Sequence, residues 1–558
     1  MCDHDRSAGN RCLRFRHAVI KRGLALLVVL FTAATLVTGA VAQAVAAVGV
    51  VPFETRAVDG TALRGHVYFP EADTPVATVL QLSPYWNTVK GPGELQADSD
   101  AVRPFVEAGF AVALVNLRGT GESDGCFQWG SRLDWNDAST VVEALAAQPW
   151  SNGNVGMYGT SYEGWTQYMA MADPPPSLKA AVPISGVIDV WSLLTRQGAP
   201  ISVGPVASTE FGTATSFVGL EPAVLNHVSC PEYVTHLHQG AELLISSDRT
   251  PYYQERDLRP LLANSPVPVL MTNGLHYVDE AHTLQFEDLW ALLRKDRTRF
   301  LLGQWGHGGE RSDFTRLAIS WFDHYLRAGP QTTVPGIVEY QDDTGAWNTA
   351  RSWPPPAESV SLYLSGQELI ATRSGVTSSQ RSFQSLDYDD STALTSAAVE
   401  QGRHGPDLAC GPHQLVYVSP PLAQEIHVAG NFSADLTVSS DLPGGNLVAT
   451  LYHTSDRSSC TNLVSGAKDS GRIQLDLRHW QQPGSSQPFP TGTPTRVTAK
   501  SLPLATTILA GERLVLVISA TSAEILPDPL KPRITIATGD QLPGLLSLPV
   551  VSGKLRFR

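Results

Sequence analysis

Residues 159–164, Gly-Thr-Ser-Tyr-Glu-Gly, hold a serine where a strand is expected to turn sharply into a helix. The apolar stretch 155–158 precedes this motif, and residues 162–172 follow it with helical spacing. Such a turn strains the serine backbone and exposes its hydroxyl above the sheet, and small neighbours let the helix pack close. We therefore predict that Ser161 is a nucleophile. The alternative is a chance match, since the chain has 47 glycines.

A serine nucleophile needs a base to remove its proton and a carboxylate to orient that base. His307 follows the strand expected at 299–302, which suits a base at a sheet edge, although a surface histidine would suit the same loop. Asp279 lies in the loop after the strand ending at Thr272 and is the predicted acid. Its neighbour Glu280 is the alternative acid, and Asp279 also suits a helix N-cap. The order serine, acid, histidine is that of α/β-hydrolases.

Acyl transfer by a serine also needs hydrogen-bond donors for the oxyanion that forms on the substrate. The backbone N–H of Tyr162 is one predicted donor, because it follows the nucleophile at the turn. The Tyr85 hydroxyl is the second, since Tyr85 follows the strand expected at 76–82; aromatic packing in that turn is the alternative. Trp86 and Trp165 lie near these positions in the sequence and are predicted to contact the substrate.

Acidic residues near the site bear on the substrate class. An ammonium group in a partly desolvated pocket needs a carboxylate, because an unpaired buried charge is costly. Asp189 follows the strand expected to end at Ile184, and Glu280 adjoins the predicted acid, so both are predicted to bind a substrate amine. The alternatives are that Asp189 caps a helix and that Glu163 only complements a helix dipole. A general acyl ester or amide is the favoured substrate.

Strand and helix patterns alternate through the first 330 residues, which indicates a doubly wound, mostly parallel sheet with helices on both faces. The expected strands are 76–82, 110–116, 155–158, 178–184, 267–272 and 299–302, and the expected helices are 101–108, 134–147, 162–172, 279–295 and 314–327. The alternation stops at 187–264, where a mainly helical cap is predicted. The α/β-hydrolase domain is therefore expected at 47–186 and 265–330.

After residue 330, short segments of alternating polarity are separated by loops rich in Ser, Thr, Pro or Gly. The clearest of these expected strands are 361–364, 434–439, 447–453, 513–519 and 533–537. Many short, spaced strands are typical of a β sandwich. We expect 331–558 to form an all-β domain of the jelly-roll type.

The first 46 residues have the layout of a secretory signal. Six basic residues precede an apolar run from Leu24 to Val37, and Ala-Val-Ala at 40–42 suits cleavage. We predict cleavage and an extracellular location, with a retained membrane anchor facing outward as the alternative. Removal of six basic and two acidic residues takes the net charge from −13 to −17. Such an acidic chain disfavours nucleic acid and anionic membranes as partners.

Four cysteines remain after the expected signal, namely Cys126, Cys230, Cys410 and Cys460. An even number in an oxidising compartment predicts two disulfides, and the domain division favours pairing the first with the second and the third with the fourth. A metal site built on His276, His282 and Asp279 lacks a completing set of ligands. We predict neither a metal nor a cofactor.

Several segments together resemble the cocaine esterase and Xaa-Pro dipeptidyl-peptidase family of serine hydrolases. They are Ser-Pro-Tyr at 83–85, Arg-Gly-Thr-Gly-Glu-Ser at 118–123, Gln-Pro-Trp-Ser-Asn-Gly at 148–153, the motif at 159–164, Gly-Gln-Trp-Gly-His at 303–307 and Ala-Gly-Glu-Arg-Leu at 510–514. The resemblance implies an α/β-hydrolase domain, a helical cap and a jelly roll. It also implies that Ser161 is the nucleophile, Tyr85 the oxyanion donor and His307 the base.

Two positions depart from that family. Tyr277 stands three residues after Gly274, where the family carries its acid, and Asn116 stands where the family tends to have aspartate. The elbow itself resembles that of α-amino acid ester hydrolases.

Taken together, the residues predict a secreted serine hydrolase that cleaves small acyl esters, amides or peptides through an acyl-enzyme. The alternative within the family is a dipeptidyl-peptidase or an α-amino acid ester hydrolase that requires a free α-amine. A non-catalytic binding protein and a metal hydrolase are the competing classes. The sequence indicates neither the natural substrate nor the oligomeric state.

Overall fold

The computed structural model describes residues 49–86, 101–201, 229–263, 265–275, 285–385, 413–455, 468–520, 525 and 528–558. The expected signal segment, 1–46, lies outside these residues. Both domains described below lie in the compact unit Val50–Arg558. Among the described helices, none combines the length and the apolarity that a membrane crossing requires.

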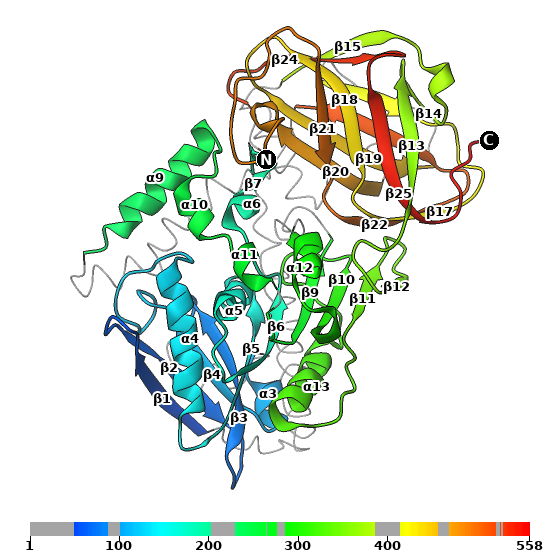
Figure 1. Ribbon diagram of the computed structural model, residues 1–558. Helices are drawn as coiled ribbons and strands as arrows, with labels where there is room; N and C mark the ends of the chain where they lie inside the picture. Colours follow the sequence, from blue (N-terminus) through cyan, green and yellow to red (C-terminus); the bar gives the residue numbers. More distant parts are fainter. Residues whose placement is uncertain are drawn as a thin grey trace, which may run out of the picture. The chain divides into compact units, whose positions relative to one another are not determined.

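The first domain is built on a ten-stranded sheet in the order β1-β2-β4-β3-β5-β6-β9-β10-β11-β12 (Figure 1). Its strands are β1 Gly49–Arg56, β2 Ala62–Phe69, β3 Val76–Ser83, β4 Ala111–Asn116, β5 Ser151–Thr160, β6 Leu178–Ile184, β9 Val269–Gly274, β10 Thr298–Gly303, β11 Ile337–Gln341 and β12 Trp347–Ala350. The neighbours from β4 to β11 are parallel, whereas β2 runs antiparallel to β4 and β12 runs antiparallel to β11. The predicted α/β-hydrolase fold is confirmed.

Helices cover both faces of this sheet (Figure 1). They are α3 Arg103–Glu107, α4 Arg132–Ala146, α5 Tyr162–Ala172, α12 Phe286–Leu292 and α13 Phe314–Arg327, with the short 3-10 helix η3 Lys295–Arg297. Successive side chains of a strand point to opposite faces. On β5, Met157 joins the core beneath α4 and α5, whereas a Cβ at Gly156 would lie 2.5 Å from the Phe322 ring of α13. Glycine is therefore needed where α13 packs on the sheet.

The sheet is longer than the sequence indicates. Strands β1 and β2 extend one edge and were not predicted. At the other edge, β11 pairs parallel with β10, so the sheet continues past residue 330, the expected end of this domain. The two strands beyond residue 330 bring the chain directly from the hydrolase sheet into the second domain.

The segment 187–264 contains mainly helices in its described part. Its elements are α6 Val190–Leu194, β7 Thr195–Arg196, β8 Ala199–Pro200, α9 Glu232–Ile245, α10 Pro251–Glu255 and α11 Arg259–Leu262. Arg256 donates to the carbonyls of Trp129 at 2.9 Å and Gln128 at 3.0 Å. The N–H of Leu258 donates to the carbonyl of Ile188 at 2.8 Å. These bonds attach α10 and α11 to the loops that follow β4 and β6.

The second domain is all β. Its strands are β13 Glu358–Ser365, β14 Glu368–Ile370, β15 Ser379–Gln384, β16 Gln414–Val418, β17 Ile426–Gly430, β18 Ser433–Ser440, β19 Asn446–Thr454, β20 Lys468–Asp476, β21 Thr495–Lys500, β22 Leu504–Ile508, β23 Arg513–Ser519, β24 Arg533–Thr538 and β25 Gly544–Ser552, and its 3-10 helices are η4 Arg373–Gly375 and η5 Leu477–His479. The strands enclose a separate core that includes Leu362, Val438 and Leu516. Alternating side chains fill this core, as expected for a sandwich.

Candidate active site

Ser161 lies at the turn between β5 and α5 with φ 63° and ψ −115°. Residues other than glycine rarely adopt a positive φ, because their Cβ then crowds the backbone. Backbone strain of this kind is concentrated at functional sites. The Ser161 N–H donates to the carbonyl of Ile184 at 2.8 Å, and its carbonyl accepts from Trp165 at 3.0 Å. A Cβ at Gly164 would lie 2.7 Å from the Cα of Gly186. Gly164, the last residue of the motif, therefore lets α5 pack closely against the end of β6.

The loop that carries His307 passes over the end of β9. Gly303 on β10 pairs with Gly274 on β9, and the N–H of Leu275 donates to the carbonyl of Gly303 at 2.8 Å. A Cβ at Gly274 would lie only 2.0 Å from the carbonyl oxygen of Trp305, so the crossing requires glycine. His307 is exposed, and the predicted acid Asp279 lies outside the described residues, within 276–284. Leu275, the last described residue before that segment, therefore lies next to the histidine loop.

The histidine loop also contacts the nucleophile turn. A Cβ at Gly308 would lie 3.1 Å from Cγ2 of Thr160, the residue before Ser161. The Gln304 side-chain amide donates to the carbonyls of Gln341 at 2.9 Å and Ala505 at 3.0 Å. The loop is consequently held between the nucleophile turn, the last strands of the first sheet and β22 of the all-β domain.

Ser185, at the end of β6, was not predicted as a site residue. It is buried with φ 47°. Its hydroxyl donates to Oδ1 of Asn273 at 3.1 Å and accepts the N–H of Gly308 at 3.2 Å. One side chain therefore joins the ends of β6 and β9 to the residue after His307. A polar residue at a strand end was the only sequence signal for this role.

Tyr85 follows β3, beside the nucleophile turn. Its ring lies edge-on to that of Tyr162 with centroids 6.4 Å apart, and it is 40% exposed. Desolvation raises the pKa of the Tyr85 hydroxyl, and the nearby Glu163 carboxylate raises it further. The phenol therefore keeps its proton at neutral pH and is able to donate it in a hydrogen bond. Tyr162 is the first residue of α5, where backbone N–H groups have no partner within the helix.

Glu163 is hydrogen-bonded to the nucleophile turn. Its Oε2 accepts the N–H of Thr160 at 3.0 Å. Burial raises the pKa of Glu163 to about 7, and the hydrogen bond from Thr160 opposes the rise. The side chain is half-buried and lies on the first turn of α5.

The two predicted aromatic substrate contacts lie in different surroundings. Trp165 is 2% exposed, and its ring packs edge-on to Trp129 and against Tyr162. Its ring is part of the hydrophobic core of the first domain. The half-buried Trp86 donates its indole N–H to the carbonyl of Gln81 at 3.0 Å, so the polar edge of its ring faces its own strand.

Asp189, predicted to bind a substrate amine, is buried within an ion-pair cluster. Its two carboxylate oxygens lie 3.0 Å from Arg249 and 3.0 Å from Arg259, and Ser192 donates to one of them at 2.5 Å. Asp257 bonds to the same two arginines. The carboxylate is therefore paired with cap arginines in this structure. Glu280, the other predicted amine ligand, lies outside the described residues.

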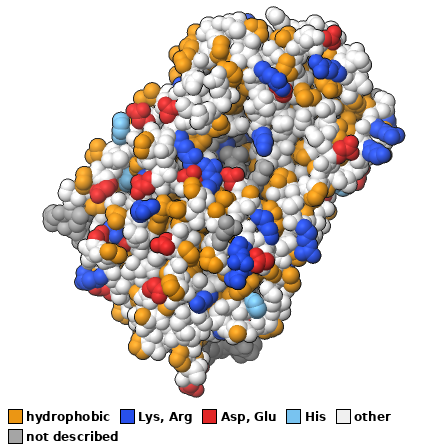
Figure 2. All heavy atoms as spheres, viewed as in Figure 1, with side chains coloured by type: hydrophobic (Ala, Val, Ile, Leu, Met, Phe, Trp, Pro, Cys, Tyr) orange, Lys and Arg blue, Asp and Glu red, His pale blue; other side chains and the backbone are white. Residues whose placement is uncertain are grey.

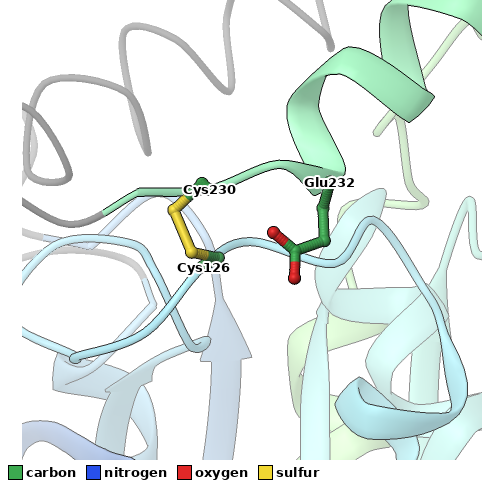
Figure 3. Close-up of side chains that lie close together, drawn as sticks. All are labelled: Cys126, Cys230 and Glu232. Atoms are coloured by element: carbon green, nitrogen blue, oxygen red, sulfur yellow. A yellow bond between two sulfur atoms is a disulfide. The ribbon is translucent and has the colours of Figure 1, made fainter.

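Cys126 and Cys230 form a disulfide, the pairing expected from the domain division (Figure 3). It joins the loop after β4 to the start of the cap helix α9. Glu232 lies beside it, and these three residues are the one His, Cys, Asp or Glu group close enough to hold a metal among the described residues. Both sulfur atoms are engaged in the disulfide, so neither is a thiolate ligand. Cys410, Cys460, His276 and His282 lie outside the described residues.

Acidic and basic side chains are interspersed over the face shown in Figure 2. Proteins that bind nucleic acid concentrate Lys and Arg on one face or stripe. The visible face therefore has no charge pattern of that kind among the described residues.

Two family models match the chain. The model described as X-Pro dipeptidyl-peptidase (S15 family) matches residues 59–309, and the model described as X-Pro dipeptidyl-peptidase C-terminal non-catalytic domain matches residues 332–540. Both matches lie on the domains described above, with the candidate site inside the first.

Individual relatives are distant. A protein named "Putative Xaa-Pro dipeptidyl-peptidase" from Bacillus anthracis is 25% identical over 370 residues, which cover 62% of this chain and 59% of that protein. The cocaine esterase of Rhodococcus sp. (strain MB1 Bresler) is 26% identical over 462 residues, covering 70% of this chain and 78% of the esterase. The matches to the two Bacillus relatives cover about three fifths of the length of those proteins.

Among solved structures, an α-amino acid ester hydrolase superimposes with a TM-score of 0.73 at 19% identity. The superposition covers 92% of this chain and 98% of that chain. The likeness extends through both domains and is a likeness of fold.

Proposed function

The chain belongs to the X-Pro dipeptidyl-peptidase (S15) family, and from this premise we propose that it is a serine hydrolase of small acyl esters or amides. Ser161 is the nucleophile, His307 the general base, and Asp279 the acid that orients the imidazole. The oxyanion donors are the Tyr162 N–H and the Tyr85 hydroxyl. The observation that carries the proposal is the strained backbone of Ser161 at a strand-to-helix turn that contacts the His307 loop.

The reaction proceeds in two steps. The Ser161 oxygen attacks the acyl carbon while its proton passes to His307, and the imidazolium then protonates the departing alcohol or amine. Water repeats the sequence on the acyl-enzyme, releases the acid and restores the serine. Negative charge on the acyl oxygen is stabilised by the two donors, which are fixed before the substrate arrives. Asp279 keeps the imidazole in the tautomer that accepts the serine proton.

A general acyl substrate is favoured over one with an obligatory α-amine. Amine recognition requires a carboxylate that the protein leaves unneutralised, since an ammonium pairs with net negative charge. Asp189 is bonded by Arg249 and Arg259 at 3.0 Å each, which argues against it in that role. The amine-requiring alternative then depends on Glu280.

We further propose that the chain is exported. The basic and apolar layout of residues 1–46 supports this, as does the disulfide, because such bonds persist in oxidising compartments.

The test is covalent labelling with a fluorophosphonate, followed by peptide mapping. Labelling at Ser161 in the wild type, absent in Ser161→Ala, is the expected result. Hydrolysis of p-nitrophenyl butyrate should fall by several orders of magnitude in the same variant. An unlabelled, folded wild-type protein would refute the proposed mechanism. Comparing this ester with an aminoacyl ester and with Gly-Pro-p-nitroanilide tests the substrate class.

A further inference from the structure

A buried histidine lies between carboxylates of the two domains. His453 is on β19, and its imidazole is fully buried. Nδ1 lies 2.8 Å from Oε2 of Glu512, in the turn between β22 and β23, and Nε2 lies 3.0 Å from Oδ2 of Asp343. Asp343 belongs to the turn between β11 and β12, the last two strands of the first sheet. One imidazole therefore connects an acid of the first sheet with an acid of the all-β domain.

Both ring nitrogens of His453 face carboxylate oxygens. A neutral imidazole has one N–H, so it can donate to one carboxylate and leaves a lone pair against the other. The imidazolium donates to both, and its charge strengthens both bonds. The geometry is therefore that of a charged histidine held between two acids. Burial alone would lower the pKa of His453, but the hydrogen bonds and charges of Asp343 and Glu512 raise it above its ordinary value.

The strands around His453 set the other neighbours of the ring. Its backbone partners are Leu514 on β23 and Lys468 on β20. The Thr506 hydroxyl on β22 lies 3.3 Å from Nε2. Among the described side chains, the two carboxylates are thus the titratable groups that bond to the ring. The charged and titratable residues on the surrounding elements are Asp342, Asp343, Glu512, Arg513, Lys468 and His427.

Strand β22, which lies beside β11 and β12 in Figure 1, connects this cluster with the histidine loop of the candidate site. The Asp343 carboxylate that bonds to the imidazole also accepts the N–H of Thr507 at 2.8 Å. Two residues earlier on β22, the carbonyl of Ala505 accepts the side-chain amide of Gln304 at 3.0 Å. Gln304 stands three residues before His307. Hydrogen bonds on one strand therefore lead from the buried imidazole to the loop that bears the proposed base.

We propose that charged His453, paired with Asp343 and Glu512, holds the all-β domain on the first sheet and, through β22, positions the His307 loop. The inference rests on the proposed function, since it takes His307 as the general base. When the proton leaves, one carboxylate faces a lone pair in a buried site, and the contact weakens. A displacement of about 1 Å can cost on the order of 100-fold in rate, so a loosened loop slows the reaction.

The sign of the pH dependence follows from the raised pKa of His453. The pair contributes stability that is fully present below about pH 6.5, the ordinary pKa of histidine. This contribution is lost as pH rises through the raised pKa. Between these two limits the unfolded chain has released a proton that the folded protein still holds. The ratio of folded to unfolded protein should therefore fall by up to about tenfold per pH unit in that window.

NMR of the folded wild type with isotope-labelled histidine measures the charge of the ring directly. The His453 signal is assigned by its loss in His453→Gln and by its displacement in Asp343→Asn. We expect both ring nitrogens to be protonated above about pH 6.5, with a titration midpoint that is lower in Asp343→Asn. A wild-type midpoint at or below about pH 6.5 would overturn the inference.

Thermal scans test the contribution to stability. The triple variant Asp343→Asn, His453→Gln, Glu512→Gln leaves the three positions uncharged. Its Tm difference, variant minus wild type, should become more positive between about pH 6 and 9, because only the wild type loses the ion pairs. Ser440→Ala is the control, since it removes a buried hydroxyl of the same domain that donates to the Gly444 carbonyl at 2.8 Å. Its Tm difference should be the same at each pH. The same constancy in the triple variant would contradict the proposal.

Values of kcat and KM on p-nitrophenyl butyrate test the positioning role. At about pH 7, His453→Gln and Gln304→Ala should each lower kcat about tenfold, with KM changed less than about threefold. The double variant should match the slower single variant within about threefold, because both changes act through one loop. Effects that multiply, or a kcat of His453→Gln equal to that of the wild type, would overturn the positioning role. If Ser161→Ala leaves kcat unchanged, the proposed function fails instead, and the NMR midpoint is unaffected.

Discussion

The Ser185 hydroxyl accepts the N–H of Gly308 at 3.2 Å, one residue after His307. The same hydroxyl donates to Asn273 at the end of β9, so the proposed base is tied to the strand that leads into the proposed acid. Ser185 itself follows β6, whose last residue accepts the Ser161 N–H. The nucleophile turn and the histidine loop therefore share one buried anchor.

Replacing Ser185 with alanine should lower kcat about tenfold, because the Gly308 N–H loses its acceptor and the histidine loop can shift. The lost buried hydrogen bonds should also cost on the order of 1 kcal/mol of stability each. The control is Ser440→Ala in the all-β domain, where a buried hydroxyl donates to the Gly444 carbonyl at 2.8 Å. That variant should lose stability with kcat intact. Equal kcat values for the two variants would contradict the anchoring role.

Asp279→Asn should lower kcat by up to about 10⁴-fold, because an amide favours the wrong imidazole tautomer. Glu280→Gln should change kcat less than about threefold and serves as the paired measurement. If Asp279→Asn leaves kcat unchanged and Glu280→Gln lowers it strongly, the acid is Glu280 and not Asp279. The KM values of both variants for an aminoacyl ester would show whether Glu280 contributes to amine binding.

The sequence predicted the elements whose buried residues form a regular pattern. Strand β6 and helices α5 and α13 have the bounds expected from apolar runs and helical spacing. Strand β1 was missed because most of its side chains are exposed and it contains Pro52, so it lacks the alternation of a half-buried strand. The pattern of β11 does indicate a strand, but alternation cannot tell which sheet a strand joins. Its parallel pairing with β10 is a contact that only the tertiary structure provides.

In the candidate site, too, the sequence predicted some features and not others. The residue type and the local turn were enough to single out Ser161. The ion pairs of Asp189 were not predicted, because its two arginine partners come from cap segments 60 or more residues later in the chain. Ser83 and Ser185 are short polar residues at strand ends, and their partners depend on which loops meet above the sheet. Sequence pattern fixes neither the partners nor the distances.

Reduction of the Cys126–Cys230 disulfide should loosen the cap from the core. The bond closes a loop of 104 residues, and disulfides of this kind typically contribute about 2–5 kcal/mol. The double variant Cys126→Ser, Cys230→Ser should have a lower Tm than the wild type, and dithiothreitol should lower the Tm of the wild type only. A Tm that dithiothreitol leaves unchanged in the wild type, with the disulfide verified by mapping, would contradict this expectation.

Asp134 should make stability depend on pH in the opposite sense to a paired carboxylate. Its side chain is fully buried on α4, Oδ2 accepts the N–H of Gly130 at 2.6 Å, and Oδ1 has no hydrogen-bond partner among the described residues. Burial, together with the charge of the neighbouring Asp137, raises the pKa of Asp134 to about 7. The unfolded chain releases this proton near pH 4, so between about pH 4 and 7 only the folded state holds it. Stability should therefore fall as pH rises through this window, by up to about 1.4 kcal/mol per pH unit, and stay low above pH 7.

Asp134→Asn removes this titration while its amide oxygen can still accept the Gly130 N–H. The Tm difference, variant minus wild type, should therefore become more positive between pH 5 and pH 8, as measured by thermal scans at constant ionic strength. Asp73→Asn, which removes an exposed carboxylate from the loop before β3, is the control for the lost charge. Its Tm difference should be the same at each pH. A pH-independent difference for Asp134→Asn would mean that the folded protein holds this carboxylate ionised throughout, with the charges of Arg118 and Arg256 outweighing its burial.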